Sequence, residues 1–424
     1  MIKRIHAENF LCFRDITLDL AGPKGKPLWY ALIYGENGSG KTNLLHTLWF
    51  LKASLDIRMV DWANELSIGR GIYETTEHHA TLFTEYSMIG SKDPIRLEYT
   101  FEIDGRDATY LMEISLKGMV KEELVYVING RKATLFSITE NDMDMDRCFP
   151  GEFRKDMRMN VQKYWGPYSM LSILVKESNN LSHIFARDNI SPELTKVVQY
   201  VKNLSIYFPD RRSISFNPLM NARGGQMPES FEPAMDAMAE AMNDFFCGLY
   251  SDIESVHYVK TRTQGGIDFE LVFDKRIEGK TVTVPLYKES SGTRKLVDEF
   301  YHIMVCVHGG VEVVDEMDSG IHDVLMKDLF GCIRESMKGQ LIATTHNTML
   351  LQNSDPRGTY ILDIDGEGCR TIRSVYSIAR TQRCNNNTKR YLEGDLGGVP
   401  VVGYMDLEGI ATRFFEKLEG SFGL

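Results

Sequence analysis

The eight residues 35–42 read Gly-Glu-Asn-Gly-Ser-Gly-Lys-Thr, and they constrain the fold more than any other part of the chain. They match the phosphate-binding pattern G-x-x-x-x-G-K-[ST] in full. An apolar run rich in β-formers precedes them at 28–34, and leucines at helical spacing follow within 43–51. Strand, glycine loop and helix are the context that this motif requires. The sequence therefore predicts an α/β fold with a nucleotide site.

The residue types in this loop explain its chemistry. Glycines let backbone N–H groups surround a phosphate, and the helix that follows adds its partial positive charge. Lys41 supplies a charge to the β- and γ-phosphates of ATP, and the Thr42 hydroxyl is a ligand for Mg²⁺. The residues expected to bind nucleotide here are Gly35, Asn37, Gly38, Ser39, Gly40, Lys41, Thr42 and Asn43.

A second group of candidate residues lies near the other end of the chain. The β-branched run 311–314 is followed directly by Asp315 and Glu316. A strand that delivers a carboxylate at its C-terminal end is how P-loop enzymes hold Mg²⁺, which is the Walker B role, here of Asp315. The adjacent Glu316 can polarise the attacking water as a general base. Without further context the two acids are weak evidence, and a solvated strand end is the favoured explanation.

Two more motifs flank this pair. Ser290-Ser291-Gly292-Thr293 opens an apolar helix, and the run 340–346 is a β-strand that ends in His346. Ser290 and His346 lie 25 residues before and 31 residues after Asp315, enough for one helix and a return to the next parallel strand. An ordinary N-cap remains the alternative for Ser290, and a structural histidine the alternative for His346.

The order of these motifs resembles the ABC-type ATPase head of the OLD/RecF/SMC-like branch, and most closely the AAA-type abortive-infection ATPases of bacteria. Residues 290–293 resemble the signature motif, Ser319-Gly320 the D-loop and His346 the switch histidine. Residues 5–13 and 391–400 resemble the opening strand and a late Tyr-Leu-x-Gly…Gly-x-Pro segment of that group. Glu289 and Thr293 stand where transporter heads usually carry Leu and Gln, and the Q-loop glutamine is not placed.

The resemblance implies a fold and a mechanism. The fold is an ABC-type P-loop ATPase head, with a mixed central sheet flanked by helices, an antiparallel β layer and a helical insertion. ATP lies between two protomers, so that Ser290, Gly292 and Thr293 of one chain contact the γ-phosphate bound to the other. Lys41, Glu316 and His346 then act in catalysis, with His346 sensing the γ-phosphate. The expected assembly is a homodimer or larger, formed around ATP.

The domain boundaries follow from the long gap between the two groups of motifs. We expect a first ATPase lobe at 1–149, a compact helical cap at 150–255, and a second lobe at 256–424. Strands are predicted at 80–86, 95–103 and 110–116, a further hairpin at 125–130, helices at 191–204 and 233–250, and a mobile loop at 222–226. No sustained heptad repeat is present, which argues against a coiled-coil arm.

Charge and hydropathy limit the environment. With 48 Lys and Arg against 59 Asp and Glu, the net charge of −11 argues against a histone-like nucleic-acid coat. Basic residues cluster at 154–163, 211–212 and 373–390, where either a solvated face or a local nucleic-acid or partner contact is possible. No apolar run approaches the ~18 residues of a membrane span, and no signal peptide is evident. We expect a cytoplasmic protein with scattered, reduced cysteines.

Two functions compete. The first is an ATPase that dimerises on ATP and gates a partner effector in bacterial anti-phage defence. Because no second catalytic constellation is visible, the effector, a nuclease or toxin, is expected on another polypeptide. The second is a RecF-like DNA-repair clamp, which would bind DNA with a strong salt dependence. A small-molecule kinase has no place for the Asp315-Glu316 pair or the distant Ser290 loop.

Overall fold

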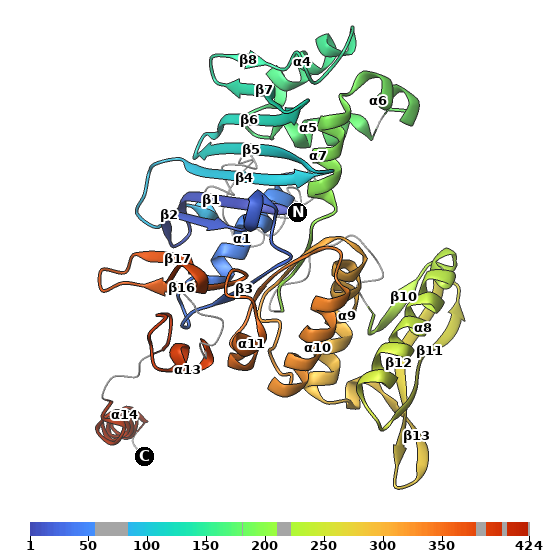
Figure 1. Cartoon of the computed structure of the whole chain (residues 1–424). Helices are drawn as coiled ribbons and strands as arrows, with labels where there is room; N and C mark the ends of the chain where they lie inside the picture. Colours follow the sequence, from blue (N-terminus) through green and yellow to red (C-terminus); the bar gives the residue numbers. More distant parts are fainter. Residues whose placement is uncertain (56–83, 180, 210–221, 379–386, 401–404, 423–424) are drawn as a thin grey trace.

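The computed structural model describes residues 1–55, 84–179, 181–209, 222–378, 387–400 and 405–422 (Figure 1). Three sheets organise them: a six-stranded sheet at the centre, a seven-stranded antiparallel sheet, and a smaller four-stranded sheet to the side. None of the helices in these ranges combines the length and apolar character needed to cross a membrane. The arrangement confirms the predicted fold class, a mixed central sheet with helices and an antiparallel β layer.

The central sheet has the strand order β17-β16-β3-β15-β14-β9. All neighbours are parallel except β17, which pairs antiparallel with β16. The strands are β3 (Tyr30–Tyr34), β9 (Ser205–Tyr207), β14 (Val311–Val314), β15 (Gln340–Thr344), β16 (Thr359–Ile364) and β17 (Arg370–Ser374). Four helices belong to this layer: α1 (Lys41–Ala53), α9 (Ser291–His308), α10 (Asp323–Ser336) and α11 (Thr348–Asn353).

The central sheet is apolar on both faces because each face packs against a different core. In β3, Ala31 and Ile33 belong to a core shared with α1 and the antiparallel sheet. Leu32 and Tyr34 belong to the core that contains residues of α9 and α10. A strand buried on both sides has no polar alternation, which is why 30–34 is apolar at every position.

The antiparallel sheet forms the layer next to α1, in the order β2-β1-β4-β5-β6-β7-β8. Its strands are β1 (Ile2–Phe10), β2 (Phe13–Asp19), β4 (Ile95–Ile103), β5 (Arg106–Ser115), β6 (Gly118–Ile128), β7 (Arg131–Thr139) and β8 (Met143–Asp144). β4 alternates strictly between buried and half-buried residues, as expected for a sheet with one face on the core. The strands predicted at 95–103 and 110–116 are therefore present, and the hairpin predicted at 125–130 is formed by the end of β6 and its turn into β7.

The segment 150–255 differs from the expected continuous helical cap. Its first part is helical, with α4 (Phe153–Tyr164), α5 (Met170–Ser178), α6 (His183–Asn189) and α7 (Pro192–Lys202) beside the antiparallel sheet (Figure 1). The chain then returns to the central sheet as β9, which pairs with β14. Because β9 has only three residues, it carries too little periodicity to be separated from the preceding helix in the sequence.

The rest of the segment joins a separate α+β unit. It consists of β10 (Gly224–Met227), α8 (Glu232–Leu249), β11 (Ile253–Thr263), β12 (Gly266–Ile277) and β13 (Lys280–Pro285). The loop predicted at 222–226 is instead largely strand β10, which pairs with β12. A methyl group on Gly224 would lie 2.8 Å from the Phe269 carbonyl oxygen, so the glycine permits close strand approach rather than mobility.

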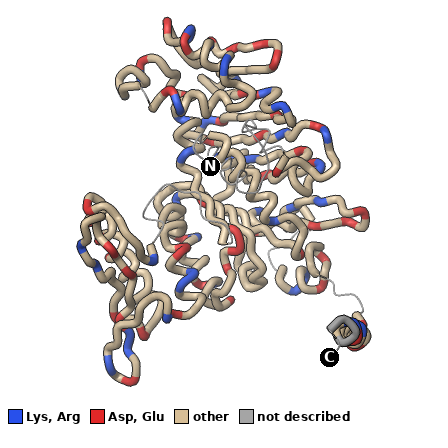
Figure 2. The backbone as a smooth tube through the Cα atoms, turned by 180° about the vertical axis from the view of Figure 1, so that it is seen from behind, with Lys and Arg blue, Asp and Glu red and all other residues tan. Residues whose placement is uncertain are grey.

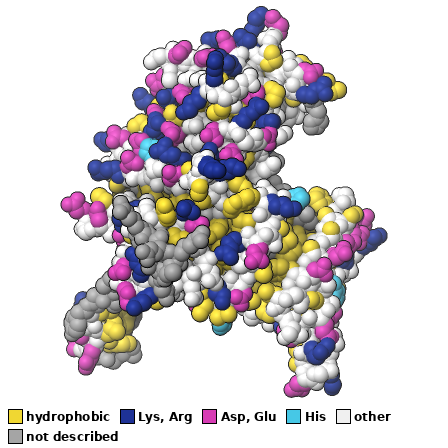
Figure 3. Space-filling view, viewed as in Figure 1, with side chains coloured by type: hydrophobic (Ala, Val, Ile, Leu, Met, Phe, Trp, Pro, Cys, Tyr) yellow, Lys and Arg dark blue, Asp and Glu magenta, His cyan; other side chains and the backbone are white. Residues whose placement is uncertain are grey.

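The strand predicted at 80–86 falls mostly outside the described residues, and its described end, 84–86, is helical. Beyond the central sheet, the chain continues through α12 (Val375–Ile378) and α13 (Asn387–Leu392) to α14 (Leu407–Phe422). α14 stands away from the body (Figure 1), and the space-filling view shows apolar side chains on it (Figure 3). Leu407, Phe414 and Phe415 are all more than half exposed.

A buried carboxylate fastens α5 to the antiparallel sheet. Glu122 on β6 is fully buried and accepts hydrogen bonds from the Tyr110 hydroxyl at 2.7 Å and the Trp165 indole at 2.9 Å. Its second oxygen also accepts the backbone N–H of Met170, the first residue of α5, at 2.7 Å. Burial raises the pKa of Glu122, while these donors stabilise its charged form.

We expect Glu122→Ala to lower the free energy of unfolding by about 3 kcal/mol, because two buried donors and one partly buried donor lose their acceptor. Urea denaturation followed by far-UV circular dichroism measures the change. Glu123→Ala, at a partly exposed neighbouring position, is the matched control and should cost less than about 0.5 kcal/mol. Equal effects of the two substitutions would show that Glu122 does not anchor α5.

Candidate functional site

The strand order brings the predicted site residues together at one edge of the central sheet. β3, β15 and β14 are adjacent and parallel, so their C-terminal ends lie side by side. The glycine loop follows β3, Thr344 ends β15, and Asp315 follows β14 directly. The carboxyl edge of a parallel sheet is where ligands bind in such folds.

The glycine loop passes into α1 through a backbone turn that requires glycine. Gly40 is the N-cap of α1 with φ 109°, in the left-handed region. A methyl group at this position would also lie 2.7 Å from Cys12 Sγ and 3.0 Å from Phe13. Cys12 also accepts a hydrogen bond from the Asn43 side chain at 3.1 Å. The turn between β1 and β2 therefore packs directly against the loop.

The remaining loop residues divide between the surface and the interior. Asn37 and Gly38 are exposed, whereas Gly35 and Ser39 are buried. A methyl group on Gly35 would lie 2.5 Å from the Leu362 carbonyl oxygen of β16 and 2.7 Å from Ser39 Oγ. No side chain fits there, so the first residue of the loop is confined between β16 and the loop itself.

Lys41 is the first residue of α1 and is only 8% exposed. Its ammonium group donates hydrogen bonds to the carbonyl oxygens of Gly35 at 2.9 Å and Glu36 at 3.0 Å. Burial lowers the pKa of Lys41, and the nearby carboxylates of Asp315 and Glu316 oppose that shift. The cation is therefore held inside the loop, facing the acidic end of β14.

A chain of hydrogen bonds joins the two groups of motifs. The Thr42 hydroxyl donates to Asp315 Oδ2 at 2.8 Å, and the Thr344 hydroxyl donates to Asp315 Oδ1 at 2.6 Å. Thr344 Oγ1 in turn accepts the backbone N–H of Glu316 at 2.7 Å. A hydroxyl and a carboxylate are the hard oxygen ligands that Mg²⁺ prefers, so Thr42 and Asp315 fit a magnesium site completed by phosphate oxygens and water.

Glu316 differs from Asp315 in exposure and in backbone geometry. Its side chain is exposed, while Asp315 is 6% exposed. Glu316 has φ 50°, a left-handed conformation that is costly for a residue other than glycine. Hydrogen bonding of its N–H to Thr344 offsets part of that cost. The backbone reverses at this point, and the carboxylate can then act on a water beside the phosphates.

His346 lies two residues after the end of β15 and is hydrogen-bonded to the segment that follows β14. Its backbone N–H donates to Asp318 Oδ2 at 3.1 Å. Burial lowers the pKa of the His346 imidazole, and the Lys41 ammonium lowers it further, while Asp318 acts in the opposite direction. The imidazole is therefore neutral at pH 7 and within electrostatic reach of Lys41.

The signature-like motif lies elsewhere on the same chain. Ser290 is the N-cap of α9, and its hydroxyl accepts the N–H of Thr293 at 3.1 Å. A methyl group on Gly292 would lie 2.8 Å from the Gly320 carbonyl oxygen, so this loop packs against the D-loop. Among the described residues, no hydrogen bond or ion pair joins 290–293 to the glycine loop. Ser290 is exposed at the end of its helix.

Three residues that support this site were not predicted from the sequence as functional. Thr344 bridges Asp315 and Glu316, and Asp318 holds the backbone of His346. Arg370 on β17 donates to the backbone oxygens of Ser39 at 3.0 Å and Cys12 at 3.4 Å. The sequence contained a signal for two of them: Thr344 lies shortly before His346, and Asp318 directly precedes Ser319-Gly320. Arg370 had none, because a hairpin distant in sequence brings it to the loop.

The basic clusters are largely neutralised where the structure describes them. Arg154 pairs with Asp146 at 3.2 Å and Lys155 with Glu152 at 2.8 Å. Lys389 pairs with Glu393 at 3.6 Å. Positive and negative residues alternate over the body of the molecule (Figure 2). This arrangement favours the solvated-face interpretation of these clusters, and residues 211–212, 380 and 383 lie outside the described part.

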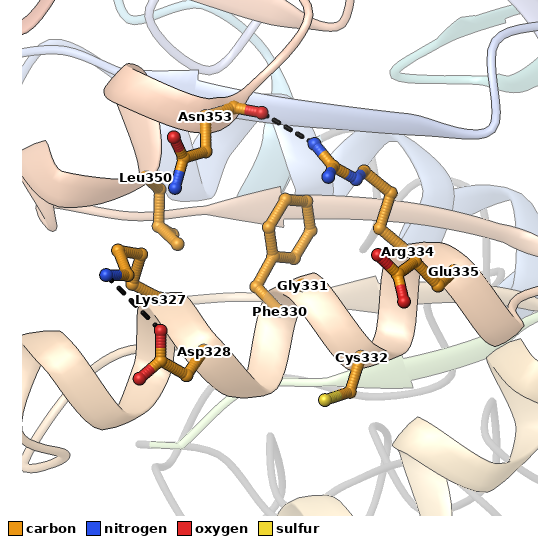
Figure 4. Close-up of a pocket in the computed structure, with 9 residues that line it drawn as sticks. All are labelled: Lys327, Asp328, Phe330, Gly331, Cys332, Arg334, Glu335, Leu350 and Asn353. Atoms are coloured by element: carbon orange, nitrogen blue, oxygen red, sulfur yellow. Dashed lines mark hydrogen bonds and ion pairs between the residues drawn. The ribbon is translucent and has the colours of Figure 1, made fainter.

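A shallow groove of about 240 Å³ lies between α10 and α11, away from the glycine loop (Figure 4). Phe330 and Leu350 are among its lining residues, and Arg334 donates to the Asn353 carbonyl oxygen at 2.6 Å across it. None of the predicted site residues lines this groove. It is therefore separate from the nucleotide site.

We expect the His346 imidazole to titrate below the ordinary value of 6.5, and Lys41→Met to raise its pKa, because one neighbouring cation is removed. Proton NMR of the ring signal across pH 4.5–8.5 measures both, with His346→Gln identifying the resonance. A midpoint at or above 6.5, or an unchanged midpoint in Lys41→Met, would contradict this description of the site.

Comparison with known structures finds heads of SMC proteins and the protein RecF. An SMC head bound to the C-winged helix domain of ScpA superposes with TM-score 0.49 at 15% identity, covering 89% of this chain and 99% of that one. The SMC head domain from Thermotoga maritima gives TM-score 0.41 at 15% identity, covering 88% and 98%. The recombination mediator protein RecF gives 0.40 at 13% identity, covering 88% and 98%. No curated protein sequence gives a significant match.

A family model matches residues 31–163 and 172–352, which are well over half of the chain and include every predicted site residue. Its description is an AAA domain, putative AbiEii toxin, type IV toxin–antitoxin (TA) system. The match confirms the resemblance to AAA-type abortive-infection ATPases that the motifs indicated. The chain therefore belongs to this AAA-domain family of P-loop ATPases.

Proposed function

We propose that this protein binds and hydrolyses ATP with Mg²⁺, dimerises around the nucleotide, and gates a separate effector in bacterial anti-phage defence. The observation that carries the ATPase part is the hydrogen bond between Thr42 and Asp315, at 2.8 Å. It joins the P-loop to the Walker B carboxylate across 273 residues of sequence. The hydrogen bond holds together the Thr42 hydroxyl oxygen and the Asp315 carboxylate oxygen, the two protein ligands that we propose for Mg²⁺.

The roles of the residues follow from their positions. Lys41 and the N-terminus of α1 bind and orient the phosphates. Thr42 and Asp315 hold Mg²⁺, which, when bound, neutralises charge developing on the transferred phosphoryl group. Glu316, exposed beside them, accepts a proton from the attacking water. His346, neutral at pH 7, is a donor to a γ-phosphate oxygen.

The dimer is supported by where the signature-like motif lies. Ser290 and Gly292 form the N-terminus of the 18-residue helix α9, and Ser290 faces solvent rather than the P-loop of its own chain. A helix N-terminus stabilises an anion. Ser290, Gly292 and Thr293 then contact the γ-phosphate bound by a second copy of the chain. ATP completes the two nucleotide sites of such a dimer, so ATP binding favours the dimer and hydrolysis to ADP favours its dissociation.

The defence role and the effector rest on the family rather than on the geometry. The family description names a toxin of a type IV TA system, and the motif order resembles abortive-infection ATPases. We infer that dimerisation is the event that the effector, a nuclease or toxin, detects. A RecF-like DNA clamp is less favoured, because most basic residues of the described clusters are paired with carboxylates.

The dimer is tested by Glu316→Gln, which removes the base and leaves the phosphate and Mg²⁺ ligands intact. We expect this variant to accumulate an ATP-dependent dimer or larger assembly, because the nucleotide is bound but not hydrolysed. Size-exclusion chromatography with light scattering measures the mass with ATP and with ADP. Ser290→Arg in the same background is the control and should remain monomeric. A Glu316→Gln protein that stays monomeric with ATP contradicts the sandwich mechanism.

Nucleotide binding itself is tested by Lys41→Ala. We expect ATP affinity to fall by roughly 100-fold, because a buried charge that orients the phosphates is lost. Isothermal titration calorimetry measures the dissociation constant, with Lys52→Ala on the same helix as the control. Duplex DNA added to the wild-type ATPase assay separates the two functions: hydrolysis stimulated by DNA would favour the clamp over the defence switch.

A further inference from the structure

The late segment 391–400 was singled out in the sequence, and the function proposed above does not use it. It begins in the last turn of α13 and contains the paired glycines Gly397 and Gly398. In the structure this segment crosses β16 and reaches the beginning of the P-loop. A methyl group on Gly398 would lie 2.7 Å from Ile361 Cγ2 and 3.3 Å from the Cα of Gly35.

Several contacts hold the turn in that place. The Gly398 N–H donates to Asp363 Oδ1 at 3.0 Å, and the Gly398 carbonyl oxygen accepts the Tyr391 hydroxyl at 3.0 Å. The Tyr391 ring packs edge-on against Tyr34, with ring centroids 5.7 Å apart. Tyr391 is 6% exposed. The turn is therefore hydrogen-bonded to the half-buried Asp363 of β16 and to the buried Tyr391 of α13.

Gly35 is enclosed by the same residues. Its own missing methyl would meet the Leu362 carbonyl oxygen at 2.5 Å, and the missing methyl of Gly398 would meet that same oxygen at 3.2 Å. The pKa of Tyr391 is raised to about 12 by burial and by the carboxylate of Glu36, the second residue of the P-loop. The Gly397–Gly398 turn thus contacts the loop at its first residue, and Tyr391, which holds the turn, lies within electrostatic range of the second.

We propose that the Gly397–Gly398 turn, held by Asp363 and Tyr391, is a positioning clamp that fixes the backbone of the P-loop at Gly35 and thereby sets ATP affinity. The carbonyl of Gly35 is also an acceptor of Lys41, so displacement of Gly35 moves the phosphate-binding lysine. The clamp contacts no phosphate and acts only through the loop. This inference rests on the proposed ATPase function and adds the C-terminal segment to the same site.

The chain offers a matched pair of glycines for the test. Gly398 has φ +67° and Gly394 has φ +84°, so alanine is strained in the left-handed region at both positions. Only Gly398 has neighbours there, since nothing lies within 4 Å of a methyl group on Gly394. We expect Gly398→Ala to weaken ATP binding about tenfold and Gly394→Ala by less than about twofold. KM for ATP should rise in Gly398→Ala while kcat stays nearly constant.

Two further substitutions keep the test independent of any folding defect in Gly398→Ala. Tyr391→Phe removes only the hydroxyl that donates to Gly398 and should weaken ATP binding about fivefold. Asp363→Ala should behave similarly, whereas Asp363→Asn keeps the Oδ1 acceptor and should restore the wild-type affinity. Calorimetric titration with ATP measures affinity, and melting without nucleotide measures folding.

The clamp is supported if affinity falls in Gly398→Ala and Tyr391→Phe without a matching fall in nucleotide-free melting temperature. The clamp is overturned if Gly398→Ala and Gly394→Ala change ATP affinity equally. It is also overturned if ATP affinity falls in proportion to the nucleotide-free melting temperature in every variant. The Lys41→Ala protein distinguishes failure of the clamp proposal from failure of the proposed ATPase function. If ATP binding depends on Lys41 but not on Gly398, the clamp proposal alone is wrong. If the wild-type protein does not bind ATP, both the clamp and the proposed ATPase function are wrong.

Discussion

The hydrogen bond from Thr42 to Asp315 is the contact on which the rest of the site depends. It joins α1, near the start of the chain, to the residue that directly follows β14, 273 residues later. Asp315 is buried, and a buried carboxylate is tolerated only when donors satisfy it, which Thr42 and Thr344 both do. Loss of either donor would leave charge uncompensated at the point where Mg²⁺ is expected to bind.

The order of strands makes that contact possible. β15 lies between β3 and β14, so Thr344 at its end stands between the P-loop and Asp315. The intervening chain is accommodated above and beside this sheet, in the antiparallel layer, in α4–α7 and in the β10–β13 unit. These additions leave the carboxyl edge of the central sheet unchanged, and β9 completes the sheet on the far side of β14.

Much of the fold and site could be predicted because short motifs carry strong local constraints. The P-loop demands strand, turn and helix, and β3 and α1 follow that pattern. β4 was predicted with its full range because its alternation is regular over nine residues. β9 and β10 were missed, since strands of three or four residues leave no periodic signal and are defined only by their partners.

The sequence by itself determined which residues carry the chemistry: the glycines and Lys41 of the loop, the acids Asp315 and Glu316, and His346 at a strand end. These are local patterns, in which residue type and spacing suffice. Only the tertiary structure decided which distant groups support them. Arg370 at the loop backbone, Asp318 at His346 and Gly398 against Gly35 are brought there by the pairing of strands far apart in the chain. Such contacts depend on three-dimensional packing, which no single stretch of sequence records.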